Sequence, residues 1–213
     1  FKDSFMDLPE KIIHTGNPIR KDLMKGSKVK GLKYFQFVES NKTIFLFGGS
    51  QGSSYLNKIL SKIIKNFENA SIQVLWQTGD TEFLKYKKFI SKTIHVTPFI
   101  NNMAEAYAIS DLIICRSGAL TISEITVCGK PSILIPFPHA AGDHQTKNAQ
   151  VLVDSKAAKG ISENTLTEKK LLFKIMNLIH NKNALDKMSK ASKALGKPNA
   201  TSKIVDQILD TDL

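Results

Sequence analysis

The sequence contains little arginine and little cysteine and has no long apolar run, and each of these absences excludes a class of protein. Arginine occurs only at positions 20 and 116, so 28 of the 30 basic residues are lysine. Bidentate readout of bases and phosphates favours the forked guanidinium group, so nucleic acid is not an expected partner. The net charge of +11 indicates a solvated lysine surface with weak attraction to an anionic membrane surface.

The cysteine content and the hydropathy restrict the class of protein further. The two cysteines, Cys115 and Cys128, have neither disulfide nor metal-ligand spacing, which fits a protein of the reducing cytoplasm. No apolar run approaches the roughly 20 residues that cross a bilayer, so we expect no transmembrane helix. The first eight residues lack an initiator methionine, an apolar signal core and a cleavage site. We therefore expect the chain to begin inside a longer protein.

Several nucleotide-binding and catalytic motifs are also missing. The glycine loop at 48–53 does not read G-x-G-x-x-G, the next strand ends in Trp76-Gln77 without an acidic residue, and Ser53 stands where a Walker motif has lysine. These differences argue against a nicotinamide dinucleotide and against a P-loop. The chain has no defensible Ser/His/Asp or Cys/His arrangement. The D-x-D at 210–212 follows a helix rather than a strand, so we regard it as chance and assign no catalytic residue and no metal ligand.

The sequence does contain a regular alternation of strands and helices. Short apolar runs predict six strands, and stretches with apolar residues at helical spacing lie between them. We expect strands at Thr43–Phe47, Ile72–Gln77, Thr93–Thr97, Leu112–Cys115, Ser132–Ile135 and Ala157–Ile161. We expect helices near 56–64, 81–90, 102–109, 119–127 and 143–153, and only helices beyond residue 165. This alternation is typical of an α/β fold, a Rossmann-like parallel sheet with helices on both faces.

The polar and glycine-rich segments follow strands. Four loops, 48–52, 99–100, 116–121 and 136–145, follow different strands, and an open parallel sheet binds its ligands at that carboxyl edge. The most informative segment runs from Cys115 to Glu124, passing from an apolar strand through a turn of small residues into a helix. The free N–H groups at such a helix start favour phosphate. The carboxylate of Glu124 has enough lone pairs to accept both hydroxyls of a ribose.

Each of these segments also has a purely structural interpretation. The strand–turn–helix loop can be an ordinary βα turn with a solvated glutamate, and a glycine-rich turn is structural as often as functional. Arg20 can clamp a phosphate or lie on the surface of a linker. The pair His144-Gln145 can belong to a helix N-cap region headed by Asp143, and the pair Phe99-Ile100 can be core. Spacing alone leaves these alternatives open.

Five motifs in this order resemble the MurG family of bacterial glycosyltransferases. The resemblance covers essentially residues 10–210, and the set is highly specific although each motif alone is weak. The motifs are Thr15-Gly-Asn-Pro-Ile-Arg20, Gly48-Gly-Ser-Gln-Gly52, Phe99-Ile100 with Asn102-Met-Ala104 and Ala106-Tyr-Ala108, Cys115-Arg-Ser-Gly-Ala-Leu-Thr121 with Ser123-Glu124, and Asp143-His-Gln-Thr-Lys-Asn-Ala149.

The resemblance implies a site for UDP-N-acetylglucosamine (UDP-GlcNAc) and roles for residues within it. It implies that Ile100 meets uracil through its backbone, that Glu124 binds the ribose hydroxyls and that Ser50 binds the phosphates. It also implies that Arg20 lies near the donor diphosphate and that Gln145 contacts the sugar hydroxyls. The helix start should line the sugar and phosphate with Ala119, Leu120, Thr121, Ile122 and Ser123. A second group is expected around them: Gly48, Gly49, Gln51, Gly52, Phe99, Arg116, Ser117, Gly118, His144 and Asn148.

The resemblance also implies an activity. The family has two Rossmann-like domains of the GT-B type, and the matched motifs belong to the C-terminal, donor-binding domain. It transfers N-acetylglucosamine from UDP-GlcNAc to lipid I, undecaprenyl-pyrophosphoryl-muramyl-pentapeptide, to form lipid II for peptidoglycan. The transfer inverts the anomeric centre by direct attack of the acceptor hydroxyl, without cofactor or obligate metal, and needs a base from the acceptor side. The implied location is peripheral, on the cytoplasmic face of the bacterial inner membrane.

A division of the chain follows from the resemblance. Residues 1–40 are expected to be an interdomain linker and a leader strand, 41–195 the Rossmann-like UDP-sugar-binding domain, and 196–213 a terminal helix that packs on an absent N-terminal domain. The apolar face of that helix consists of Ile204, Val205, Ile208 and Leu209. We therefore expect a chain that binds UDP-GlcNAc but is catalytically incomplete without its acceptor domain.

Two other functions remain open. One is a naturally separate donor subunit, similar to the small soluble partner of the eukaryotic dolichol-linked N-acetylglucosamine transferase. Such a subunit begins near its first glycine-loop strand, so the leader at 1–40 argues against it. The other is a nucleotide-binding regulatory module that has no transfer activity.

Overall fold

A computed structural model, which describes residues 12–210, shows one parallel sheet of six strands. The strands are β1 (Thr43–Phe47), β2 (Gln73–Gln77), β3 (Ile94–Thr97), β4 (Leu112–Cys115), β5 (Ser132–Leu134) and β6 (Ala158–Gly160). Their order across the sheet is β3-β2-β1-β4-β5-β6, and every neighbouring pair is parallel. The prediction of a Rossmann-like sheet is confirmed.

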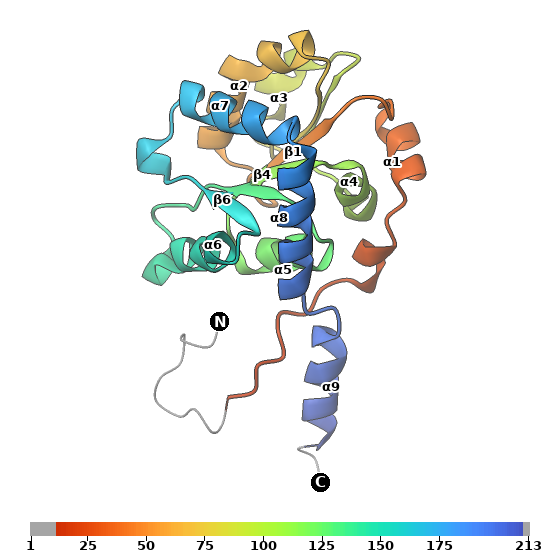
Figure 1. The fold of residues 1–213 in the computed structure, drawn as a ribbon, viewed down its shortest axis with the longest axis vertical. Coiled ribbons are helices and arrows are strands. Elements are labelled where there is room, and N and C mark those ends of the chain that lie inside the picture. The colour runs from red at the N-terminus through yellow and green to blue at the C-terminus, as the bar shows by residue number, and fades with distance from the viewer. Residues whose placement is uncertain (1–11, 211–213) are drawn as a thin grey trace.

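Helices cover both faces of this sheet (Figure 1). One face carries α2 (Ser54–Asn69), α3 (Phe83–Tyr86) with the short 3-10 helix η4 (Lys87–Phe89), and α7 (Glu168–Ile179). The other face carries α1 (Lys28–Phe35), α4 (Met103–Ile109), α5 (Ala119–Val127) and α6 (His144–Asp154). Helix α8 (Lys182–Leu195) packs against both α7 and α5, so it joins the two layers. The other elements are η3 (Lys21–Lys25), η5 (Ala141–Asp143), η6 (Glu163–Thr165) and α9 (Ala200–Asp210).

The strand sequences explain why both faces are covered. All five residues of β1 are buried. Ile44 and Leu46 belong to the core beneath α2 and α7, whereas Phe45 and Phe47 belong to the core beneath α4 and α5. A parallel strand that is apolar on both faces needs a layer of helices on each side.

The segment 1–40 is expected to contain a leader strand, but its described part, 12–40, has η3 and α1 and no strand. The Ser27 side chain caps α1 by accepting a hydrogen bond from the N–H of Lys30, and Phe35 is buried at the end of the helix. The segment therefore buries apolar surface against the domain as a helix. The role of 1–40 as an interdomain linker stays a prediction.

The helix expected at 81–90 is also shorter than predicted. It consists of α3, which has four residues, followed by η4. The rings of Tyr86 and Phe89 both turn inward onto Trp76, with centroids 4.9 and 6.0 Å from the indole. Packing of these aromatic residues against one indole replaces the regular helical stripe that the spacing suggests.

The strand order places a topological switch point between β1 and β4. The chain runs from β1 outward to β2 and β3 on one side, and from β4 outward to β5 and β6 on the other. Connections that diverge in this way leave a crevice at the carboxyl ends of the two central strands, where ligands bind. Phe47 and Cys115, the last residues of β1 and β4, lie side by side in the register of the sheet. The loops that follow them therefore flank the crevice.

The last helix stands apart from the sheet and its covering helices (Figure 1). In α9, Val205 is 47% exposed and Leu209 is 62% exposed, so at least part of the predicted apolar face is open to solvent. The expected packing of this helix on another domain stays a prediction. None of the helices within 12–210 combines the length and the apolar character needed to cross a bilayer.

Candidate functional site

The glycine loop after β1 forms one wall of a cavity of about 550 Å³. Gly49 has a φ of +97° and open space where a side chain would stand, so the backbone faces the cavity without obstruction. Gly52 has a φ of +80°, and a Cβ there would lie 2.0 Å from the carbonyl oxygen of Thr78. Ser50 is exposed on this loop. The structural and the functional interpretation of the loop are therefore compatible, because Gly52 is needed for packing and Gly49 leaves the backbone open to the cavity.

The turn after β4 leads directly into α5 and leaves the start of that helix open. The N-cap is Gly118, which has no side chain to accept a hydrogen bond from the first N–H groups. Ala119 and Leu120 are exposed, and Leu120 is 59% so. The first N–H groups of a helix lack partners within the helix and carry the positive end of its dipole. This helix start is therefore suited to bind a phosphate or a sugar hydroxyl.

Helix α6 holds that turn in place through two amide side chains. Gln145 Oε1 accepts hydrogen bonds from the N–H groups of Ser117 at 3.3 Å and of Phe137 at 3.0 Å. Asn148 Nδ2 donates to the carbonyl oxygen of Ser117 at 3.0 Å. The oxygen of the Gln145 amide is therefore engaged inside the protein, and its NH₂ group is the part that a sugar can meet. His144 is exposed beside it and bonds through Nδ1 to the Ala141 carbonyl.

Glu124 lies one turn further along α5 and is half-buried. The hydroxyl of Tyr107 donates a hydrogen bond of 2.8 Å to its Oε2 atom. Burial raises the pKa of the Glu124 carboxyl; the Tyr107 hydrogen bond and the positive charge of Arg20 oppose this, and the negative charge of Asp22 adds to it. The glutamate is thus only partly open to solvent, and it has no salt-bridge partner among the described residues. It is held by one donor and has acceptor capacity left.

The two arginines have different environments. Arg116 is 7% exposed, and its guanidinium makes several contacts inside the domain. Its Nη1 donates to the carbonyl oxygens of Ile135 and Pro136, both at 3.1 Å, its Nη2 donates to Ser53 Oγ at 3.0 Å, and it pairs with Glu163. These contacts give Arg116 a structural role in the cavity wall. Arg20 is exposed, and its charge acts on Glu124.

Three further predicted residues have contacts within the chain. Ile122 is 4% exposed and belongs to the core. The hydroxyl of Ser123 bonds to the Ala119 carbonyl at 2.9 Å and accepts a hydrogen bond from Asn17 at 2.9 Å, which ties the leader to α5. The N–H of Ile100 donates to Gln77 Oε1 at 2.9 Å. A uracil that uses this N–H has to displace Gln77, whereas the Ile100 carbonyl is the other backbone group that can meet it.

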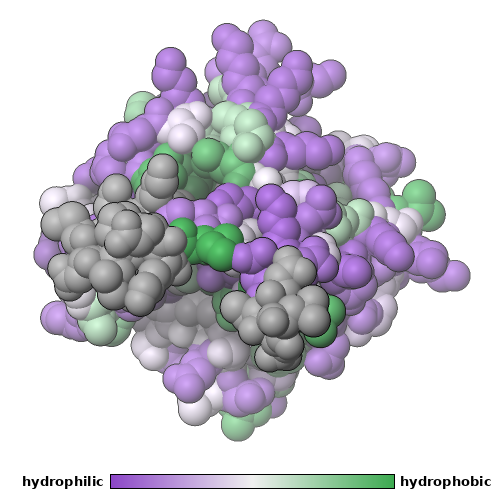
Figure 2. All heavy atoms as spheres, turned by 90° about the horizontal axis from the view of Figure 1, so that it is seen from below, coloured by the Kyte–Doolittle hydropathy of each residue, from purple (hydrophilic) through white to green (hydrophobic). Residues whose placement is uncertain are grey.

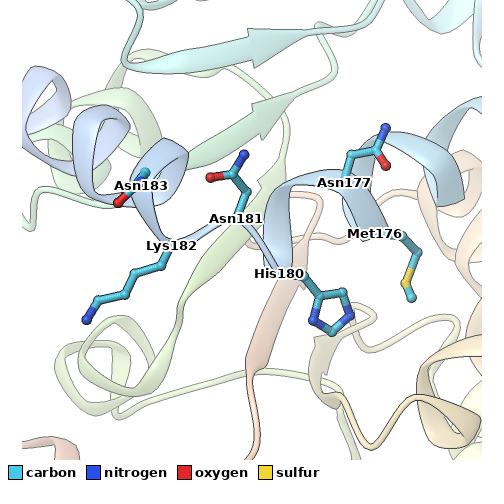
Figure 3. A pocket seen from close by; sticks show the side chains of 6 residues that line it. All are labelled: Met176, Asn177, His180, Asn181, Lys182 and Asn183. Atoms are coloured by element: carbon cyan, nitrogen blue, oxygen red, sulfur yellow. The ribbon is translucent and has the colours of Figure 1, made fainter.

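Two other hollows are present, and the first of them shares the expected residues Ala119, Ser123 and His144. One, of about 590 Å³, is bounded by residues 12–17, α5 and α6. The end of the molecule at which α9 stands shows apolar side chains gathered near its centre among hydrophilic ones (Figure 2). The second hollow, of about 510 Å³, lies at the junction of α7 and α8. In Figure 3, Asn177 and Asn181 point to the side opposite to Met176, His180 and Lys182. These side chains do not converge on one ligand.

Clusters of three or more metal-ligating side chains are absent from 12–210. Of the remaining expected positions, Gly48 and Gln51 line the cavity, whereas Phe99, in the loop after β3, and Thr121, in the first turn of α5, are not part of its lining. The structure therefore brings the glycine loop, the β4–α5 turn and the start of α6 together at the switch point. Whether each residue contacts a ligand stays a prediction.

Comparison with known proteins identifies the family. The family described as "Glycosyltransferase family 28 C-terminal domain" matches residues 43–206. The chain belongs to this family. Its Rossmann-like sheet is that of the C-terminal domain of GT-B glycosyltransferases. The crystal structure of MurG from Acinetobacter baumannii superposes with a TM-score of 0.70 and is 36% identical, covering 80% of this chain and 52% of that one.

Two curated relatives carry the same functional name. The proteins from Christiangramia forsetii and Flavobacterium psychrophilum are 39% and 40% identical to this chain over 93% and 94% of its length. Both are named "UDP-N-acetylglucosamine--N-acetylmuramyl-(pentapeptide) pyrophosphoryl-undecaprenol N-acetylglucosamine transferase". The chain spans about half the length of these relatives, since it covers 55% of each. The glycosyltransferase VinC, which is 15% identical with a TM-score of 0.62, shares the fold.

Sequence analysis missed the residues that hold the site in shape. Gln77 links two loops, because its Nε2 donates to the Gly49 carbonyl and its Oε1 accepts from Ile100. Asn17 links the segment before α1 to α5 by donating a hydrogen bond to Ser123, and Tyr107 donates a hydrogen bond to Glu124. A polar residue that ends an otherwise apolar strand is a signal for Gln77. A lone tyrosine among alanines in a short buried helix is the corresponding signal for Tyr107.

Proposed function

We propose that this chain is the donor-binding part of an inverting, UDP-GlcNAc-dependent hexosyltransferase that converts lipid I to lipid II in peptidoglycan synthesis. The observation that carries the proposal is the switch-point crevice, where the glycine loop, Arg116 of the β4–α5 turn and Gln145 line one cavity, and the β4–α5 turn leads into an open helix start with the half-buried Glu124 one turn further along. The names of the relatives supply the sugar nucleotide and the acceptor.

The residues of the crevice have chemically distinct tasks in this proposal. The N–H groups at the start of α5, with Ser50 on the glycine loop, bind the diphosphate, and Arg20 adds a positive charge on the open side. Glu124 accepts the two ribose hydroxyls. The NH₂ group of Gln145 donates to a sugar hydroxyl, while its oxygen keeps the β4–α5 turn in place. The leaving diphosphate is thereby stabilised as negative charge develops on it.

The acceptor side completes the reaction in this proposal. An inverting transfer requires a base that takes the proton of the attacking acceptor hydroxyl. We assign that base, and the site for lipid I, to the half of the relatives' length that this chain does not match. The lysine-rich surface of the chain adds weak attraction to the anionic cytoplasmic face of the inner membrane, where a lipid-linked acceptor is found.

Calorimetric titration of the chain with UDP-GlcNAc tests the proposal, with UDP-glucose and NADH as comparators. We expect UDP-GlcNAc to bind in preference to both. Glu124→Gln keeps the shape of the side chain but removes the charge, and it should weaken binding roughly tenfold or more, because hydrogen bonds to a charged acceptor contribute about 1.5–3 kcal/mol. Lys170→Gln, on the outer face of α7, is a matched surface control. Binding of NADH, or of no uridine nucleotide by a folded sample, would overturn the proposal.

A further inference from the structure

Tyr107 lies directly beside the carboxylate that we propose binds the ribose. Its hydroxyl donates to Glu124 Oε2 over 2.8 Å, and the bond joins α4 to α5 on one face of the sheet. The tyrosine is 1% exposed, and its ring packs edge-on against Phe45 and Phe47 with centroids 6.0 and 6.4 Å apart. The position of the hydroxyl is therefore fixed by the core.

This contact leaves the carboxylate able to accept two more hydrogen bonds. An ionised carboxylate has about four lone-pair positions on its two oxygens. Tyr107 uses one position on Oε2, so Oε1 and the second position on Oε2 remain. Two neighbouring ribose hydroxyls need two acceptor positions in a fixed relation to each other. A glutamate that is already held by Tyr107 loses less rotamer freedom when it binds them.

We propose that Tyr107 is a positioning residue that fixes the Glu124 carboxylate for both ribose hydroxyls and so makes the site prefer ribonucleotides to 2′-deoxyribonucleotides. The inference rests on the proposed function, because it takes Glu124 as the ribose ligand. A deoxyribose offers one hydroxyl fewer, so it gains less from a carboxylate whose two oxygens are oriented in advance.

Binding should also depend on pH through the Glu124 carboxyl, and the contact with Tyr107 should shift that dependence. The charged groups that act on Glu124 are Arg20 and Asp22 from the segment before α1, and the nearby cysteine thiols are neutral because burial raises their pKa. Binding needs the ionised carboxylate, so affinity is full above the pKa of Glu124 and falls as the pH decreases through it. The hydrogen bond from Tyr107 lowers that pKa, so removal of the hydroxyl should move the acid limb to higher pH.

The test compares UDP with 2′-deoxy-UDP in calorimetric titrations of the chain, of Tyr107→Phe and of Tyr86→Phe at several pH values. Tyr107→Phe keeps the packed ring and removes only the hydroxyl. It should weaken UDP binding roughly three- to tenfold, weaken 2′-deoxy-UDP binding less, and shift the acid limb upward. Tyr86→Phe is the matched control, because Tyr86 is 2% exposed and belongs to the core on the opposite face of the sheet from Tyr107 and Glu124. It should change none of these quantities.

The outcomes separate this inference from the proposed function. Equal loss of affinity for the two nucleotides, or an acid limb that does not move, would refute positioning by Tyr107. An NMR titration of the Glu124 carboxyl without ligand gives a second measurement, in which Tyr107→Phe should raise the pKa. If Glu124→Gln weakens UDP binding and Tyr107→Phe does not, only the inference fails. If the unmodified chain binds neither nucleotide, the proposed function fails and the inference fails with it.

Discussion

Replacement of Arg116 tests whether a residue from a sequence motif supports the fold rather than the ligand. Its guanidinium joins the start of α2, the end of β5 and η6 through Ser53, the carbonyls of Ile135 and Pro136, and Glu163. The side chains of the ion pair are only 9% and 15% exposed. Arg116→Ala would leave a buried carboxylate and two carbonyl groups without their donor.

Loss of one partner of a buried pair costs about 3–5 kcal/mol. In a chain of this size a change of 1 kcal/mol shifts the unfolding temperature by roughly 2–4 °C, so Arg116→Ala should lower the Tm by roughly 6–20 °C. Differential scanning calorimetry measures this shift directly. The double variant Arg116→Met with Glu163→Gln should lose less, because no buried charge remains unpaired.

Arg20→Ala provides the matched control, since it removes the only other arginine from an exposed position. It should leave the Tm within about 1 °C, because exposed charges away from a packed site contribute little to stability, and it should weaken UDP-GlcNAc binding. The reasoning would be refuted if Arg116→Ala kept its Tm but lost the ligand. That result would make Arg116 a ligand contact and its internal hydrogen bonds dispensable.

Three further predictions follow from individual contacts. Gly52→Ala should destabilise the chain by more than about 2 kcal/mol in urea unfolding, because it combines a positive φ with a clash at the Thr78 carbonyl, whereas Gly49→Ala should cost only about 1–2 kcal/mol of backbone strain. Equal costs would contradict this. Asn57→Ala should cost about 2–3 kcal/mol and shift the emission of the single tryptophan, whose Nε1 donates to Asn57; an unchanged spectrum would count against it. Burial raises the pKa of Cys128 to about 11, so alkylation should be slow at pH 8 and faster above pH 10 by mass spectrometry, and rapid labelling at pH 8 would refute this.

The architecture could be predicted from sequence because apolar pattern and layer structure are directly linked. A strand such as Thr43–Phe47, buried at every position, allows little except a parallel sheet covered on both faces. The leader was harder to predict, because Phe35 becomes a core residue only when the rest of the domain is present to receive it. The same limit applies to Tyr86 and Phe89, whose contacts with Trp76 depend on the tertiary fold and not on local spacing.

The site could be located from sequence, but the task of each side chain could not. The motifs predict which loops meet at the switch point, because parallel strands end at a common edge. They do not reveal that the side chains of Gln145, Asn148 and Arg116 form hydrogen bonds with the backbone of those loops. These hydrogen bonds can be found only when the positions of both partners are known, because the partners are distant in the sequence. Substitutions within the motifs should accordingly divide into two groups.

One group replaces residues that hold the loops in place and should lower the Tm. The other group replaces residues that face the crevice and should lower the affinity for the ligand. Arg116 and Gly52 belong to the first group and Ser50 and Arg20 to the second, since only the latter two are exposed. Glu124 belongs to the second group although it is half-buried, because burial makes its ionisation costly in the free chain. A ligand that hydrogen-bonds the carboxylate offsets that cost. The Glu124→Gln variant should therefore bind more weakly while the chain unfolds at an equal or higher temperature at neutral pH, a combination that a purely structural glutamate would not give.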